Sequence, residues 1–300
     1  MNTLPVLIRR EFWEHRALWI APLVVAAALL LAATFGRATV NLPKEALDAT
    51  LSVNDRLAVF AVTQWGLALF QLLVMLIVLF FYLLDCLYAE RKDRSILFWK
   101  SLPVPDSTTV LSKLLIALVI VPLGVYVLAL VTNLLFAGVL GLRQGESKLL
   151  GSVFIWDTGV WLQVQLLLLV GLAAAMLWYA PIAAYLMLVS SWARRNVFLW
   201  AVLPPVLALF VEEVTFNTDY VKSFLGHRLG GIWGEFGIGR ELDRLESALE
   251  QDASVPPVRQ LLETVDASAP FTSPDLWLGV VVAALLVWAA ARIRRYRDDT

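Results

Sequence analysis

Few residues of this 300-residue chain have the types and spacing that catalysis needs. One cysteine and two histidines are too few for a thiolate or imidazole metal site. The sequence has no phosphate-binding G-x-x-x-x-G-K-[ST] loop, no H-E-x-x-H pair and no G-x-S-x-G nucleophile motif. Glu212 and Glu213 are neighbouring carboxylates, but acids at the end of an apolar run are typical of a membrane boundary. We therefore expect no catalytic residue, no metal site and no cofactor on this chain.

A second set of candidates consists of amide side chains inside apolar runs, where polar groups usually face the interior of a helix bundle. They are Gln64, Gln71, Asn133, Gln163 and Gln165. Such amides can hold helices together, which is the simpler interpretation, or they can line the pathway of a transported molecule. Because they are uncharged, they do not identify that molecule.

The most distinctive charged stretch is Glu90–Lys100, which can form one helix that carries aromatic residues, among them Phe98 and Trp99, beside dense charges. Two prolines follow and would end this helix, and Asp106 or Ser107 could cap the next one. A short helix with exposed aromatic residues suits docking into a groove on another protein. The alternative is a basic loop that lies on lipid headgroups.

The composition indicates that much of the chain faces lipid. Hydrophobic residues make up 60% of the sequence and charged residues 16%, and the mean hydropathy is +0.75. A soluble protein has roughly 45–50% apolar and about 25% charged residues. The stretches that match or approach the ~20 apolar residues of a membrane span are Ala17–Phe35, Val59–Leu84, Leu114–Leu140, Val160–Ser190, Val197–Val211 and Leu276–Ala291. We predict an all-α polytopic membrane protein with six transmembrane helices, in which residues 1–300 form a single transmembrane domain.

Basic residues concentrate beside alternate ends of these spans. If the spans alternate in direction, one side of the membrane receives Arg9, Arg10, Arg16, Arg91, Lys92, Arg94, Lys100, Lys113, Arg194, Arg195, Arg292, Arg294, Arg295 and Arg297. Basic loops stay in the cytoplasm, so we predict a bacterial inner-membrane protein with both termini cytoplasmic. The net charge of −1 argues against a nucleic-acid partner.

Two of the spans are irregular. Val160–Ser190 is too long for one perpendicular helix and contains Pro181, which predicts a single tilted or kinked helix. Val197–Val211 is short and contains two adjacent prolines. We expect it to be broken, or to enter the membrane only partway, before it continues to Phe216.

Two polar regions flank the spans. In residues 1–16, Leu4, Leu7, Ile8 and Phe12 recur at helical spacing while Arg9, Arg10, Glu11 and Glu14 take the other face. This pattern predicts an interfacial helix before the first span. Residues 215–274 form a periplasmic segment between spans five and six, with short helices expected around 240–252 and 258–265. We expect this segment to pack on the bundle as a lid or a lateral pair of helices.

The connection between spans two and three resembles that of type-2 ABC transporter permeases, the membrane subunits of ABC exporters whose ATPase is a separate chain. The matching residues are Glu90-Arg91, Ser95, Leu102-Pro103-Val104 and Lys113. The chain departs from the family at Ser95, where glycine is frequent, and at Pro105-Asp106, where a serine–arginine pair is frequent. The resemblance extends to the N-terminal helix, the six spans and the helical segment before the last span.

This resemblance implies a permease that pairs with a second permease copy, more often as a homodimer, and that binds a P-loop ABC ATPase carrying ATP and Mg²⁺. The ATPase would dock on the cytoplasmic coupling loop, residues 87–107. The coupling residues would be Glu90, Arg91, Arg94, Ser95, Phe98, Trp99, Leu102 and Pro103. Membrane lipids are further expected partners. Two other functions stay open, namely a non-transporting scaffold that recruits a cytosolic protein and a secondary transporter.

Overall fold

The computed structural model describes residues 3–35, 53–93, 105–143, 155–236 and 265–296, and within them every regular element is a helix. In chain order the helices are α1 (Thr3–Glu14), α2 (Ala17–Phe35), α4 (Val53–Asp85), α5 (Tyr88–Lys92), α7 (Asp106–Leu115), α8 (Val121–Arg143), α10 (Thr158–Trp178), α11 (Ala180–Trp192), α12 (Val197–Val211), α13 (Tyr220–Glu235), α16 (Ala269–Thr272) and α17 (Pro274–Tyr296). Two π-helical turns, η1 (Ile116–Ile120) and η2 (Glu212–Phe216), continue α7 into α8 and extend α12.

Six helical stretches in the described residues are long and apolar enough to cross a membrane. They are Ala17–Phe35, Arg56–Lys92, Asp106–Arg143, Thr158–Trp178, Val197–Phe216 and Pro274–Tyr296. Each coincides with one of the predicted spans, so the prediction of an all-α, multi-pass membrane protein is confirmed. The second and third stretches are longer than predicted, because α4 with α5, and α7 with η1 and α8, extend beyond the apolar runs at both ends.

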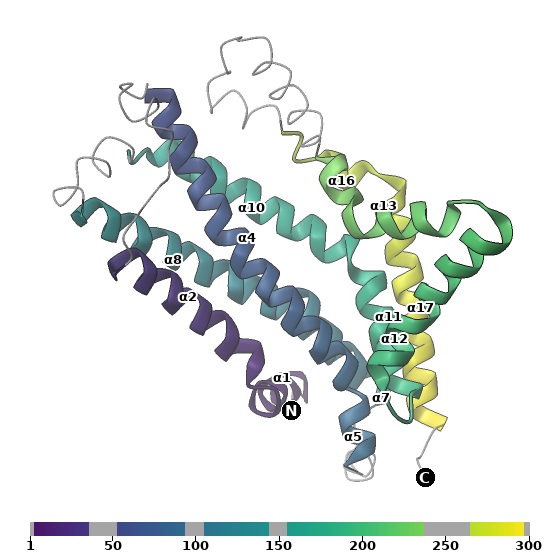
Figure 1. Cartoon of the computed structure of the whole chain (residues 1–300). Helices are drawn as coiled ribbons and strands as arrows, with labels where there is room; N and C mark the ends of the chain where they lie inside the picture. The colour runs from purple at the N-terminus through teal and green to yellow at the C-terminus, as the bar shows by residue number, and fades with distance from the viewer. Residues whose placement is uncertain (1–2, 36–52, 94–104, 144–154, 237–264, 297–300) are drawn as a thin grey trace.

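The helices pack in two neighbouring groups (Figure 1). In one, α2, α4 and α8 lie side by side and α10 crosses α4, while in the other α11 packs along α17. The largest apolar core joins the two groups near one end of the bundle, where Leu87, Val110, Ile116 and Met187 are buried. The N-terminal helix and the end of α17 also lie at this end, which we call the terminal end of the bundle.

The fourth span bends at Tyr179, between α10 and α11 (Figure 1). Pro181 lies in the first turn of α11, where its missing N–H removes the least hydrogen bonding. The amide of Ala183 donates to the carbonyl of Tyr179 over 3.0 Å, so the helix resumes directly after the bend. The prediction of a kinked fourth span at this proline is confirmed.

The fifth span is not broken at Pro204 and Pro205, contrary to one of the expected outcomes, and it continues to Phe216 as expected. Pro205 has no N–H for the carbonyl of Ala201, its partner four residues earlier. The hydroxyl of Tyr185, on α11, donates to that carbonyl over 3.0 Å. A neighbouring helix thus replaces the missing bond, which explains how the helix tolerates its prolines.

Replacing Tyr185 by phenylalanine should destabilise the chain by about 1 kcal/mol, because the carbonyl of Ala201 then loses its partner inside the bundle. Thermal unfolding in detergent would measure the change. The loss should shrink in a Pro205→Ala background, where the amide of the new residue can bond Ala201 within α12. An equal loss in both backgrounds would contradict this role for Tyr185.

The segment after the fifth span folds back on the bundle through α13 (Figure 1). The indole N–H of Trp178 donates to the backbone carbonyl of Arg228 over 2.9 Å. The hydroxyl of Tyr179 donates to the backbone carbonyl of Leu229, also over 2.9 Å. Ile232 and Phe236 complete a small apolar core against Trp178. The expectation that this segment packs on the bundle holds for α13. The helices expected around 240–252 and 258–265 lie outside the described residues, except for Val265.

The side chain of Arg228 also connects α13 to α10 and α17. Its guanidinium lies 4.9 Å from the centre of the Trp178 ring, and its Nη1 donates to the carbonyl of Asp275 over 3.1 Å. Burial lowers the pKa of Arg228, and the nearby Asp275 charge opposes that shift. Gly279 on α17 leaves the space that the guanidinium fills, since a Cβ there would lie 1.5 Å from Nη2.

Candidate functional site

A buried ionic cluster lies at the terminal end of the bundle, where four helices that are distant in sequence meet. Its members are Glu11 from α1, Glu90 from α5, Lys113 from α7 and Arg294 from α17. All four residues are at most 3% exposed. The two acidic and two basic side chains are equal in number, so their formal charges cancel. We refer to these four residues as the ionic cluster.

Lys113 and Glu90 are at the centre of the ionic cluster. The Nζ of Lys113 lies 2.5 Å from Oε1 of Glu11 and 3.2 Å from Oε1 of Glu90. The Nη1 of Arg294 donates to the other carboxylate oxygen of Glu90. The Nε of Arg294 lies 3.0 Å from Oδ1 of Asp106, at the start of α7. Glu90 thereby joins α5 to both α7 and α17.

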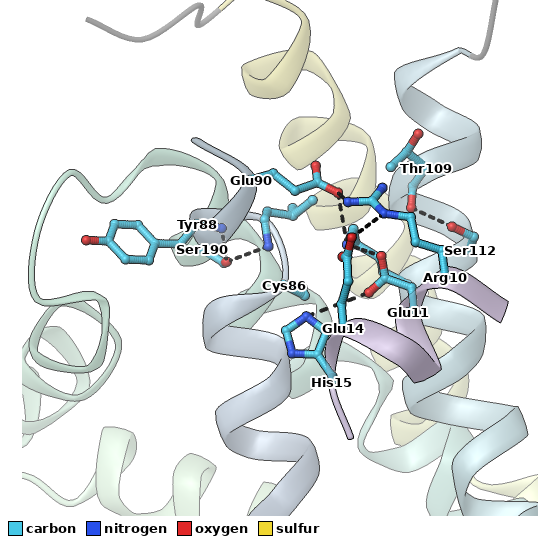
Figure 2. Close-up of polar contacts among 12 residues, drawn as sticks. Arg10, Glu11, Glu14, His15, Cys86, Tyr88, Glu90, Thr109, Ser112 and Ser190 are labelled. Carbon is cyan, nitrogen blue, oxygen red and sulfur yellow. Dashed lines mark hydrogen bonds and ion pairs between the residues drawn. The ribbon is translucent and has the colours of Figure 1, made fainter. Parts of the chain in front are cut away.

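Further contacts tie the N-terminal helix to this centre. Figure 2 shows Arg10 and Glu11, both on α1, reaching toward Glu90 from the same side. The Nη2 of Arg10 lies 3.3 Å from Oε1 of Glu90, and its Nε lies 2.6 Å from Oε1 of Glu14. The hydroxyl of Tyr82 donates to Oε2 of Glu11 over 3.1 Å. Glu90 is therefore paired with three cations, from α1, α7 and α17.

The short helix α5 is held from its other side by the end of α11. The backbone amides of Leu87 and Tyr88 donate to the hydroxyl of Ser190 over 3.2 and 3.0 Å (Figure 2). The Nη2 of Arg91 donates to the carbonyls of Ser190 and Ala193 over 2.6 and 2.9 Å. A cation suits this position because the last carbonyls of a helix lack partners within it. Glu90 and Arg91, adjacent in sequence, thus fix α5 to different parts of the bundle.

The ionic cluster connects four helices through buried ion pairs. Charges removed from water are tolerated only when paired, and removing one partner of a buried pair costs about 3–5 kcal/mol. Glu11, Glu14 and His15 have ligand atoms within 4.8 Å of one another, the spacing of a metal site. Both carboxylates, however, are already bound by Lys113, Tyr82 and Arg10. We therefore assign no metal to this group.

The predicted coupling residues divide into two sets. Glu90 and Arg91 are buried and contact their own chain, so they hold the start of the coupling loop in place. The remaining six lie outside the described residues: Arg94, Ser95, Phe98, Trp99, Leu102 and Pro103. Capping by Asp106 or Ser107 was a wrong prediction, since Pro105 holds the cap position of α7 without a side-chain bond. The carboxylate of Asp106 is bound to Arg294 instead.

The predicted pathway amides lie inside the chain, between α4, α8 and α10. Gln64, Gln71, Asn133 and Gln165 are buried, and Gln163 is partly buried. The side-chain amide of Asn133 donates to the backbone carbonyl of Gln64 over 3.4 Å, which favours the helix-contact interpretation for this pair. The amide groups of Gln71 and Gln165 are buried without a hydrogen-bond partner in the described residues. A pathway role for these residues stays a prediction.

The sequence interpretation missed the ionic cluster as a unit. Glu11 lies on the charged face that the sequence predicts for residues 1–16, and it is 2% exposed, because α1 contacts α7. From the sequence, Arg294 is one of several basic residues that follow the last span. One signal was available in Lys113, a single cation within the run VLSKLLIALVI, where an unpaired charge would be unfavourable.

Comparisons of the chain with protein-family models, with curated proteins and with solved structures give no match.

Proposed function

We propose that this chain is the permease subunit of an ATP-driven ABC exporter, in a bacterial inner membrane with both termini cytoplasmic. Two copies would form the translocation pathway, and a separate P-loop ATPase would dock on the coupling loop. The observation that carries the proposal is the position of Glu90. It lies near the start of the loop that resembles the family's docking element, and it is paired with Lys113, Arg294 and Arg10 on three other helices.

The ionic cluster supports a mechanical role for the coupling loop. A loop that transmits force must be fixed to the spans, because a freely moving loop would absorb the displacement. Glu90 fixes α5 to α1, α7 and α17, while Arg91 fixes it to the end of α11. ATP binding that draws the docked loop toward the ATPase dimer would therefore displace these helices together. ATP hydrolysis by the partner ATPase would supply the energy for transport. This agrees with a permease sequence that has no phosphate-binding loop of its own.

Affinity purification of the full chain from its native membrane in mild detergent tests the proposal. We expect a P-loop ATPase to co-purify and to hydrolyse ATP. The double change Phe98→Ala/Trp99→Ala should abolish ATP hydrolysis in the purified fraction. Phe216→Ala/Tyr220→Ala is the matched control. These two aromatic residues are exposed, and they lie at the end of η2 and the start of α13, outside the coupling loop. A complex with full activity that survives the first double change would contradict docking through this loop.

The same preparation separates the two alternatives. A scaffold would retain a cytosolic protein, but it would show no ATP-dependent change in its spans. A secondary transporter would purify without an ATPase and would move its substrate in liposomes on an ion gradient alone. Either result would overturn the proposed function.

A further inference from the structure

A groove of about 820 Å³ opens beside the ionic cluster, at the terminal end of the bundle. Its walls are the turn between α1 and α2, the end of α4 and the start of α12. This volume is in the range of small-molecule sites. Tyr82 and His15 line the groove and also contact Glu11, so these two side chains connect the groove to the cluster.

The floor of the groove is apolar and belongs to a helix that is long and apolar enough to span a membrane. Ile77 and Phe81, on successive turns of α4, are 52% and 57% exposed. Val78, Leu84 and Phe198 extend this surface toward α12. An extended acyl chain lying along α4 would cover these side chains.

One arginine lines the groove, and two more are adjacent in sequence to a residue that lines it. Arg16 lines one wall, and Arg194 and Arg195 directly precede Asn196, which lines the other. All three arginines are exposed, and none of their side chains makes a hydrogen bond or ion pair within the described residues. Of the two acids in the lining, Glu14 is bound by Arg10, which leaves only Asp85 to oppose them.

We propose that this groove binds one anionic phospholipid from the membrane leaflet at the terminal end. Its phosphate would bind Arg16 together with Arg194 or Arg195, and one acyl chain would lie along Ile77 and Phe81. Basic pockets between spans are suited to anionic headgroups, and the apolar floor selects a lipid over a free phosphate ion. The inference depends on the six spans and goes beyond the proposed function, because it requires no ATPase.

Native mass spectrometry of the delipidated full chain, titrated with palmitoyl-oleoyl phosphatidylglycerol, tests this site. We expect one lipid per chain to bind more tightly than phosphatidylcholine with the same acyl chains. Arg16→Gln, and the double change Arg194→Gln/Arg195→Gln, should each weaken that binding by at least about fivefold. Arg292→Gln removes an exposed arginine at the same end but outside the groove, and it should leave the affinity unchanged. Thermal unfolding of each variant verifies that it is folded.

A second variant tests the floor independently of charge. Ile77→Trp should fill the groove and abolish tight binding, whereas Leu285→Trp, at a position that is 62% exposed on α17, should not. Equal affinity for both lipids, or an unchanged affinity in the arginine variants, would overturn the proposal. So would displacement of the lipid by millimolar glycerol phosphate, which would indicate a site for soluble phosphate. A second copy of the chain that occupies the groove would appear as a lipid-free dimer and would also overturn it.

Discussion

Replacing Lys113 by methionine is expected to destabilise the chain by about 3–5 kcal/mol, the usual effect of removing one partner from a buried ion pair. The change leaves Glu11 without its 2.5 Å partner and Glu90 without one of its three cations. Unfolding in detergent, followed by circular dichroism against temperature or denaturant, measures the loss. Lys222→Met is the matched control, because that side chain is 76% exposed and its pair with Asp219 should contribute little. Similar losses in the two variants would contradict the assignment.

The Glu11→Gln variant completes a double-mutant cycle with Lys113→Met. Once Lys113 is gone, neutralising Glu11 removes an uncompensated charge, so the second change should be far less damaging than it is alone. Coupling between residues in contact is about 0.5–3 kcal/mol. Strict additivity would show that the two residues do not interact as the 2.5 Å distance indicates.

Replacing Gly279 by alanine should have the second largest effect, a destabilisation of about 1–3 kcal/mol. The new Cβ would lie 1.5 Å from Nη2 and 2.6 Å from Cζ of Arg228, so the guanidinium must leave its position. It would then lose its stacking on Trp178 and its bond to Asp275, and α13 would loosen from the bundle. Thermal unfolding gives the overall loss, and protease sensitivity at α13 gives its location.

Gly138→Ala is the control for this change, and it should act in the opposite direction. Gly138 is exposed on α8, and a Cβ there has no neighbour within 4 Å. Alanine is the better helix former by up to about 1 kcal/mol, so this variant should be as stable as the parent or more so. If both alanine variants have the same stability, the close contact between Gly279 and Arg228 is not what holds α13 against the bundle.

The spans were predictable because hydropathy alone determines where a helix can cross a bilayer. Pro181 likewise indicated the bend of the fourth span, since its missing N–H acts locally. The outcome at Pro205 was not predictable, because the partner of the freed Ala201 carbonyl is Tyr185, on the preceding helix. Local sequence shows which bond a proline removes, but it does not show which neighbour replaces it.

The ionic cluster could not be predicted for a similar reason. Glu11 and Lys113 are 102 residues apart, and Glu90 and Arg294 are 204 residues apart. In the sequence each cation is one of several that flank a span, where it is indistinguishable from a residue that only sets orientation. The buried, paired charges can be distinguished from the exposed ones only once α1, α5, α7 and α17 are seen to meet at one point.

We propose that the ionic cluster transmits movement from a docked ATPase to the spans. Pulsed electron spin resonance on the ATPase complex tests it, with one spin label per permease chain at Val24→Cys. Val24 is 61% exposed on α2, whereas the native Cys86 is 1% exposed, which favours labelling at the introduced site. We predict an inter-chain distance that changes when ATP is added, and no such change in Glu90→Gln although its ATPase stays bound. An unchanged distance in the parent complex, or the same change in Glu90→Gln, would contradict the account.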